Sequence, residues 1–226
     1  MLSSELIQSF KFGMDKFDSF GLPNFQDDEI LLILNQAQDR FVKQRYGETN
    51  TKKFGFEEIQ KRTEDIKNIV KPVTLIPNPN VPDNINSNAQ FVDLPSDYWI
   101  NIFERALISY KDCTGGITND ECYVKAITHE EYSGSINNPY TKPYNGKVLR
   151  MEADGKIELL HSSDVTITGY KLRYLREPIR ITALITCELS PMVHSEIVSM
   201  AITIGLEGIE SKRINTYIPI IQNTNE

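Results

Sequence analysis

Apolar residues recur every three or four positions near both ends of the chain, which is the period of an amphipathic helix. The spacing predicts three helices in the first third, over residues 3–17, 27–46 and 56–70. The apolar stripe of the second helix comprises Ile30, Leu31, Leu34, Ala37 and Phe41. Gly47 is expected to end the second helix, and the pair Lys71-Pro72 is expected to end the third.

A further helix is predicted near the other end of the chain. Ser190 suits the cap position and Pro191 suits the first helical turn. The buried stripe of this helix would consist of Val193, Ile197, Met200, Ala201 and Ile204. We expect it to pack with the N-terminal helices, and we expect residues 215–226 to form a tail that is flexible or bound to a partner.

The middle of the chain has the pattern of β-structure. Residues 77–88 are rich in Pro and Asn and predict a loop, and from residue 91 to 181 short apolar or alternating runs lie between turn residues. The clearest hairpin spans residues 148–160, where Asp154-Gly155 supplies the positive φ angles of a tight turn. Thr128 and Glu131 have the spacing of a capping box and predict a short helical turn.

These patterns predict an α+β fold in which a helical bundle, built from N-terminal and C-terminal helices, carries an inserted and mainly antiparallel β-rich region. The predicted parts are the N-terminal helices of the bundle (1–72), the inserted β-rich region (73–183), the C-terminal helix that rejoins the bundle (184–214) and the tail (215–226).

Charge argues against a nucleic-acid-binding protein of the usual basic kind. The 24 Lys and Arg face 31 Asp and Glu, which gives a formal net charge of −7. Such a chain repels a phosphate backbone unless a basic patch is segregated to one face. The densest basic stretch, residues 43–62, is interleaved with glutamates and is typical of a solvated helix surface. We therefore expect no sequence-specific nucleic-acid binding.

Cysteine usage and hydropathy indicate a protein made in a reducing cytoplasm. Cys113, Cys122 and Cys187 are odd in number and lack metal-site spacing, so we expect free thiols. Residues 1–13 lack the apolar run of a signal peptide. The longest apolar stretch, residues 197–206, is too short to cross a bilayer, so no membrane partner is expected.

Motifs that carry chemistry are weak in this sequence. His129, Glu130 and Glu131 lack the second His of a zinc-binding H-E-x-x-H motif, and a capped turn explains them better. The alternating asparagines of residues 84–88 lack the Gly and Glu that a calcium loop needs. We therefore expect no catalytic residue, no metal site and no cofactor, and the protein is predicted not to be an enzyme.

Two alternatives remain open at this point. A cryptic enzyme could assemble a site from His129, Glu131 and a distant residue. A glycan-binding module could instead use Tyr98, Trp99 and the tyrosine-rich residues 132–144. For both alternatives the structural role is the commoner one, since aromatic residues that enter a strand usually pack in a core.

Several segments carry a resemblance to a known family through their composition and their order along the chain. They are residues 41–47 (FVKQRYG), 55–63 (GFEEIQKRT), 92–98 (VDLPSDY), 122–132 (CYVKAITHEEY), 138–143 (NPYTKP) and the final helix over 190–213. In this order they resemble ring-forming head-to-tail connector (adaptor) proteins of crAss-like and related podoviral phages. The resemblance covers roughly residues 24–217, and none of its motifs is catalytic.

The resemblance implies a structural virion protein at the head-tail junction. It would form a ring of copies of itself, expected to be twelve, beneath the portal protein, with a channel for DNA and with downstream tail or ring proteins as further partners. The C-terminal tail would dock into the portal. Alternatives within the virion are another ring, a tail-completion protein or a capsid accessory subunit.

The physical pattern is compatible with a ring subunit. A ring needs two different surfaces that meet by rotation, and the loops over residues 77–88 and 134–145 would supply such surfaces. We also expect an acidic lumen, which would let DNA slide past; a pore lined mainly by Lys and Arg would contradict that expectation.

Overall fold

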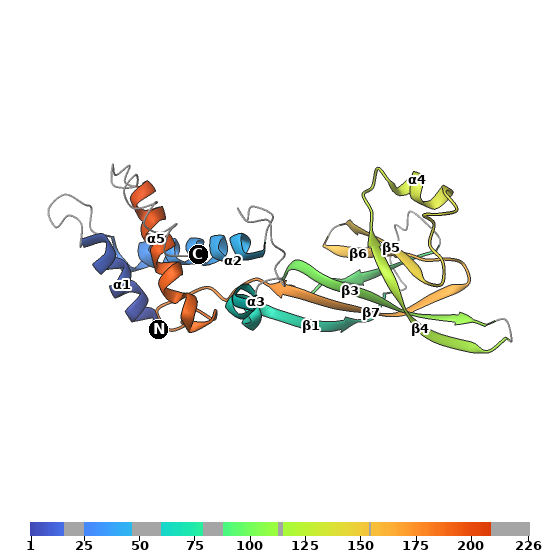
Figure 1. Cartoon of the computed structure of the whole chain (residues 1–226), viewed down its shortest axis with the longest axis horizontal. Helices are drawn as coiled ribbons and strands as arrows, with labels where there is room; N and C mark the ends of the chain where they lie inside the picture. Colours follow the sequence, from blue (N-terminus) through green and yellow to red (C-terminus); the bar gives the residue numbers. More distant parts are fainter. Residues whose placement is uncertain (16–24, 47–59, 79–87, 113–114, 154, 209–226) are drawn as a thin grey trace. The chain divides into compact units, whose positions relative to one another are not determined.

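The computed structural model describes residues 1–15, 25–46, 60–78, 88–112, 115–153 and 155–208. Its chain divides into two compact units (Figure 1). We call residues 1–69 together with 178–226 the helical unit, and residues 70–177 the sheet unit. The predicted tail lies outside the described residues, and the predicted four-part division stays a prediction.

The described part of the helical unit is built from helices. They are α1 (Ser3–Asp15), α2 (Asp27–Tyr46), α3 (Gln60–Ile66), the 3-10 turns η1 (Lys67–Ile69) and η2 (Pro191–Val193), and α5 (His194–Gly208). α5 packs against both α1 and α2. The core of this unit consists of side chains with little exposure, including Leu6, Phe10, Ile30, Leu34, Ala37, Phe41, Ile197 and Ala201. A glycine allows close packing here, because a Cβ on Gly13 would lie 2.2 Å from Cδ1 of Ile202.

The fold is α+β, but the predicted helical bundle is wrong. Helices of a bundle run within about 20° of one another's axes, whereas α2 crosses α5 instead of running along it (Figure 1). The helices are also not confined to the two ends of the chain, since α4 (Tyr132–Asn137) lies within the sheet unit. A helical apolar period buries one side of a helix without setting the crossing angle, which depends on the side-chain ridges at the contact.

The predicted third helix is also corrected by the structure. Residues 56–59 lie outside the described residues, α3 is short, and Val70 already begins strand β1 (Val70–Leu75). Lys71 and Pro72 therefore lie inside a strand, where we had expected them to stop a helix. β1 is an edge strand, and an edge tolerates a proline because one row of its backbone groups needs no partner strand.

The sheet unit contains one curled sheet of seven strands among the described residues (Figure 1). After β1 come β2 (Ala89–Asp93), β3 (Tyr98–Lys111), β4 (Ile117–Ala126), β5 (Lys147–Ala153), β6 (Lys156–Leu160) and β7 (Val165–Arg176). The order across the sheet is β1-β7-β3-β4-β5-β6-β2. β4 and β5 pair in parallel, with α4 in the connection between them, and the other neighbours pair antiparallel.

Local turn chemistry explains two connections of the sheet. The predicted hairpin is confirmed: β5 and β6 are antiparallel neighbours, and Gly155 has a φ of 69° in the turn. The predicted capping pair is also present, because Thr128 N–H donates to Glu131 Oε2 at 3.5 Å and Glu131 N–H donates to Thr128 Oγ1 at 3.3 Å. This pair closes the turn that precedes α4.

The two faces of the sheet are covered differently. The main apolar core lies on one face and includes Ala106, Ile108, Cys122, Val124, Val148, Ile167, Tyr170 and Leu172. A smaller cluster with Leu149, Met151 and Leu160 packs with Tyr132 and Ile136 of the α4 segment. Ala89 of β2 lies opposite Leu160 and belongs to the same cluster. Because directly opposite residues share a face, the α4 segment covers the far face around β5, β6 and the start of β2.

A polar network is buried beside the main core. The Tyr170 hydroxyl donates to Glu104, and Arg150 Nε lies 3.1 Å from Glu104 Oε2. The side chains of Arg150 and Glu104 are 11% and 13% exposed. Burial raises the pKa of Glu104 above its ordinary value, and hydrogen bonding from Tyr170 opposes that shift. The network ties β7, β3 and β5 together through side chains as well as through the backbone ladder.

Candidate interaction surface

The predicted chemical residues are engaged in local structure. Glu131 closes the turn with Thr128, and His129 Nε2 lies 3.1 Å from the Glu152 carbonyl oxygen. His194 is buried, and its Nε2 lies 3.1 Å from the Leu189 carbonyl oxygen. Among the residues that the structure describes, no group of three or more His, Cys, Asp or Glu side chains is placed to hold a metal ion.

The aromatic residues considered for glycan binding are not gathered on one platform. Tyr98 packs against the main core of the sheet, with its ring 5.7 Å from that of Tyr174. Tyr132 packs in the smaller cluster under α4 instead. Tyr140 is 89% exposed in the following loop.

Among the helices that the structure describes, none combines the length and the hydropathy that a membrane span requires.

A different feature of the helical unit has the properties of a protein-binding surface. Residues 178–189, which we call the clamped segment, have no regular secondary structure and lead into η2 and α5. Such a segment has no backbone ladder of its own, so its N–H and C=O groups need other partners. Side chains of the surrounding helices supply those partners.

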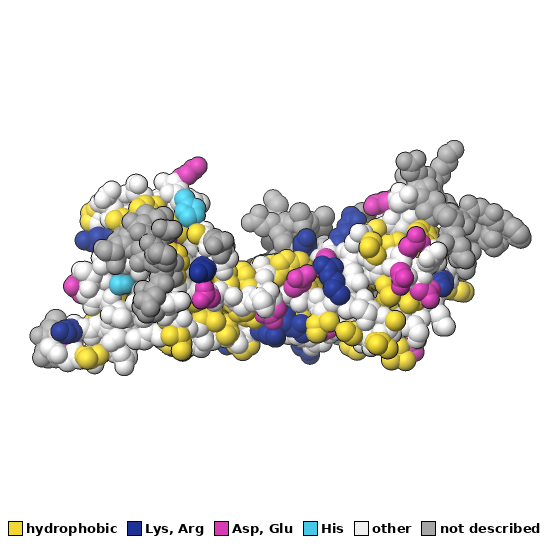
Figure 2. Space-filling model, turned by 180° about the vertical axis from the view of Figure 1, so that it is seen from behind, with side chains coloured by type: hydrophobic (Ala, Val, Ile, Leu, Met, Phe, Trp, Pro, Cys, Tyr) yellow, Lys and Arg dark blue, Asp and Glu magenta, His cyan; other side chains and the backbone are white. Residues whose placement is uncertain are grey.

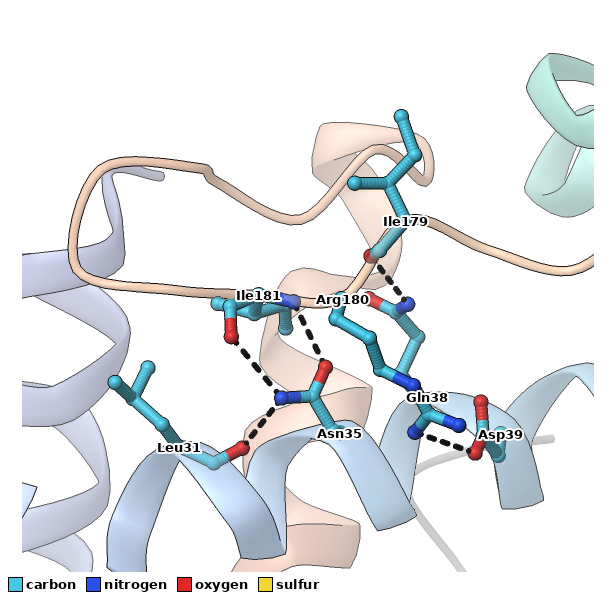
Figure 3. A network of polar contacts seen from close by, with 7 residues as sticks. All are labelled: Leu31, Asn35, Gln38, Asp39, Ile179, Arg180 and Ile181. Carbon is cyan, nitrogen blue, oxygen red and sulfur yellow. Dashed lines mark hydrogen bonds and ion pairs between the residues drawn. The ribbon is translucent and has the colours of Figure 1, made fainter. Parts of the chain in front are cut away.

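Helix α2 holds the clamped segment with two amide side chains (Figure 3). Asn35 Oδ1 accepts from the Ile181 N–H at 2.8 Å, and Asn35 Nδ2 donates to the Ile181 carbonyl at 3.0 Å. The same Nδ2 also donates to the Leu31 carbonyl at 2.8 Å, which orients the amide. One turn further along α2, Gln38 Nε2 donates to the Ile179 carbonyl at 3.1 Å. Asn35 thus binds the segment as a neighbouring strand would.

An ion pair next to these amides holds Arg180, the residue between Ile179 and Ile181. Arg180 Nη1 lies 2.9 Å from Asp39 Oδ2, also on α2 (Figure 3). Arg180 is 54% exposed, so this pair contributes little to stability on its own. It does orient the segment, because residues 179 and 181 face the α2 amides while residue 180 reaches along the helix.

The rest of the clamped segment is held from other sides. Ser3 Oγ donates to the Ala183 carbonyl at 2.8 Å, and Asn68 Nδ2 donates to the Glu188 carbonyl at 3.0 Å. Within the segment, the Thr182 N–H donates to the Ile185 carbonyl at 3.0 Å and closes a turn. Residues from α1, α2 and η1 therefore hold the clamped segment near both of its ends and at the turn in between.

This pinned backbone presents apolar side chains outward. Leu184 at the turn is 95% exposed and Met192 in η2 is 85% exposed, while Ile181 and Leu189 are buried as inward anchors. Hydrophobic side chains reach the surface of the helical unit in several places (Figure 2). Exposed apolar side chains on a rigid backbone favour binding to another protein, since ordering the loop costs no further entropy at that step.

A cluster of charges lies beside Met192. Arg45 of α2 binds Glu196 of α5, its Nε lies 3.3 Å from Asp65 Oδ2 of α3, and Lys61 Nζ lies 3.5 Å from Glu196 Oε1. Burial raises the pKa of Asp65, and the Arg45 charge opposes that shift. The cluster borders a pocket of about 320 Å³ that Met192 also lines. It joins α2, α3 and α5 next to Met192.

Sequence reasoning missed the clamp. Asn35 and Gln38 interrupt the apolar stripe of α2 at helical spacing from Leu31 and Leu34, and Gln38 has no exposed surface. Polar amides on an otherwise buried helix face were the available signal, because buried amides are almost always hydrogen-bonded. The partner could not be found from sequence, since it lies more than 140 positions away.

The chain is similar to known proteins over most of its length. A family model described as phage tail ring protein 3/4 matches residues 1–216. The chain is similar to "Ring protein 4/5" of Bacteroides phage crAss001, with 26% identity over 207 residues that cover 81% of this chain and 83% of the relative. It is also similar to "Ring protein 3" of the same phage, with 24% identity over 84% of this chain and 89% of the relative.

Proposed function

We propose, from the premise that this chain belongs to the phage tail ring protein 3/4 family, that it forms a closed ring of its own copies joining the capsid portal to the tail. Family membership confirms the resemblance to ring proteins of crAss-like phages and gives the chain a structural role in a phage virion. The match over residues 1–216 is the observation that carries the proposal. The proposed role is not enzymatic.

The clamped segment supports this function because its backbone is held in place next to exposed apolar side chains. A ring subunit needs surfaces that keep their shape before assembly, so that each new contact repeats the same rotation. Leu184 and Met192 stand on a backbone that is hydrogen-bonded on several sides. We propose that they contact a neighbouring subunit of the same ring.

The finer details of this function come from the resemblance of the sequence. They are a ring of twelve copies, a DNA channel through its centre, the portal protein as one partner and a downstream tail or ring protein as the other. The two relatives have different ring numbers in their names. We therefore propose a connector ring without assigning its level in the stack.

The test is the assembly state of the purified chain. Native mass spectrometry and negative-stain images of the protein, alone and mixed with the portal protein, should show a closed ring in at least one condition. Leu184→Ser should weaken that ring, because it removes an exposed apolar contact while leaving the core unchanged. Leu32→Ser is the matched control, since Leu32 is 59% exposed on α2 outside the clamped segment.

Two outcomes would count against the proposal. A chain that remains monomeric both alone and with the portal would contradict the ring function. Rings that bind a tail protein but never the portal, in parallel pull-downs, would move the chain to another ring or to a tail-completion role.

A further inference from the structure

We propose that the open face of the sheet is a basic docking surface for the acidic surface of a second copy of this chain. This inference rests on the proposed ring function and assigns one side of the contact between subunits. The surface, which we call the basic face, consists of Arg105, Lys125, Lys147, Lys171 and Arg173 together with Phe103 and Tyr123.

Strand register places these side chains on one face. Lys171 of β7 lies opposite Arg105 of β3, Arg105 lies opposite Tyr123 of β4, and Tyr123 lies opposite Lys147 of β5. Directly opposite residues point to the same side of a sheet, and strands lie about 4.8 Å apart. One row therefore carries three cations and a tyrosine across four strands.

A second row extends the basic face. Arg173 lies opposite Phe103, two positions along β7 and β3 from the first row. Lys125 follows Tyr123 by two positions on β4 and so shares its side of the sheet. This is the side opposite the main core, because the intervening Val124 and Leu172 belong to that core.

The cations on this face are not fully neutralised within the chain. Lys171 pairs with Glu121, and both side chains are nearly half exposed. Arg173 has no ion-pair partner among the described residues. Lys147 Nζ donates to the Thr141 carbonyl at 2.7 Å, which holds the ammonium but does not neutralise its charge. Burial lowers the pKa of Lys147, and the nearby Lys125 charge lowers it further, so these two cations repel each other. Glu121 lies two positions before Tyr123 on β4 and so shares this face, but one acid does not balance five cations. The remaining positive charge favours binding of an anionic surface.

The aromatic side chains indicate a protein partner. Phe103 is 47% exposed and Tyr123 is 57% exposed, and Arg105 Cζ lies 5.7 Å from the Phe103 ring centre. Exposed aromatics with arginine at the centre and charged residues around them are typical of protein interfaces. A sheet face with stacked aromatics can also bind single-stranded nucleic acid, which the experiment below separates.

Charge complementarity identifies the partner as the chain itself. Removing these five cations from the 24 Lys and Arg leaves 19, against 31 Asp and Glu. The rest of the chain therefore has a formal net charge of 19 − 31 = −12, so another copy offers the opposite charge to the basic face. A ring contact joins two different patches of identical chains, and complementary charges steer such patches together and set their register.

Charge reversal on and off the basic face tests the inference. Arg173→Glu and Lys125→Glu should each raise the protein concentration needed for half-maximal ring assembly by about tenfold or more. Lys142→Glu is the control, because Lys142 is an exposed cation of the same unit outside the basic face and the change in net charge is the same. Wild-type assembly should also weaken between about 0.1 M and about 1 M NaCl, where the Debye length falls from about 10 Å to about 3 Å.

The outcomes separate this inference from the proposed function. Assembly is measured by native mass spectrometry, on the portal if the wild type assembles only there, and circular dichroism checks folding of each variant. If the wild type never forms a ring, the proposed function fails. If the wild type forms rings and both variants assemble as well as Lys142→Glu, only the basic face is refuted. If the wild type binds labelled single-stranded or duplex DNA, and the two variants lose this binding but assemble normally, the basic face binds nucleic acid and the inference of a second copy is refuted.

Discussion

The helical unit and the sheet unit satisfy their backbone groups in different ways. In the sheet unit, the strand ladder pairs the N–H and C=O groups, so side chains on the open face remain available. In the helical unit, the clamped segment has no ladder, and the side chains of Asn35, Gln38, Ser3 and Asn68 take its place. Residues on the open face of the sheet unit can therefore change without loss of the fold. In the helical unit, by contrast, these polar side chains are needed to hold the backbone in place.

This difference also separates two kinds of proposed contact. The helical unit offers a small apolar tip whose position depends on buried amides. The sheet unit offers a broad charged face whose position depends on the ladder and on the network of Glu104, Arg150 and Tyr170. Substitutions on the basic face should therefore affect assembly alone, while substitutions at Asn35 should affect stability and assembly together.

The largest effect is expected in the buried network of the sheet unit. Arg150→Met leaves the Glu104 carboxylate buried without its cation, and we expect a loss of about 3 kcal/mol in the free energy of unfolding by urea. Glu152→Gln is the comparison, because Glu152 also pairs with Arg150 but its side chain is 54% exposed. It should change stability by less than about 0.5 kcal/mol. Equal losses in both variants would contradict the prediction, because the cost would then not come from the buried Glu104 carboxylate.

A smaller loss is expected at the clamp. Asn35→Ala removes both bonds to Ile181 and leaves that residue's N–H and C=O near a nonpolar side chain, so we expect a loss of about 2 kcal/mol. Hydrogen exchange of residues 179–185 should become faster. Asn137→Ala is the matched control, since Asn137 also donates to the carbonyl four residues earlier and, among the described residues, makes no hydrogen bond to a distant segment. Unchanged exchange in Asn35→Ala would contradict the clamp.

The hairpin turn is expected to be less sensitive. Gly155 has a φ of 69°, a conformation that strains other residues, so Gly155→Ala should cost about 1 kcal/mol. Gly134→Ala serves as its control, because a Cβ there meets nothing within 4 Å and Gly134 does not have a positive φ. Thermal unfolding of the two variants side by side gives the difference, and equal melting temperatures would contradict the prediction.

The smallest effect concerns pH. Burial lowers the pKa of His194 below its ordinary 6.5, so the unfolded chain binds the proton first as the pH falls. The stability from neutral His194 is therefore present above pH 6.5 and is lost as the pH falls through the folded-state pKa. Urea unfolding from about pH 8 to about pH 5 should show this loss. The His194→Gln variant should show a shallower dependence in that window; an identical slope would contradict the assignment.

Local rules of the chain predicted a good part of the fold. The helix over residues 27–46 matches α2, and Asp154-Gly155 predicted the turn between β5 and β6. The pair Thr128 and Glu131 predicted the turn before α4. Each of these features depends on neighbours within a few positions, where capping, turn conformation and apolar period act directly. The family resemblance depended on the order of such short segments along the chain, which the sequence also contains.

The sequence by itself determined the helical stretches of α2 and α5, the β-rich character of the middle of the chain, the acidic charge of the chain and its family. The crossing of α2 over α5, the parallel pairing of β4 with β5 and the place of Lys71-Pro72 in an edge strand were decided only in the tertiary structure. The clamp and the basic face belong to this second group. Asn35 meets Ile181 across 146 positions, and Lys171 meets Arg105 only after β7 pairs with β3. Contacts of this range depend on packing and register, which no local pattern specifies.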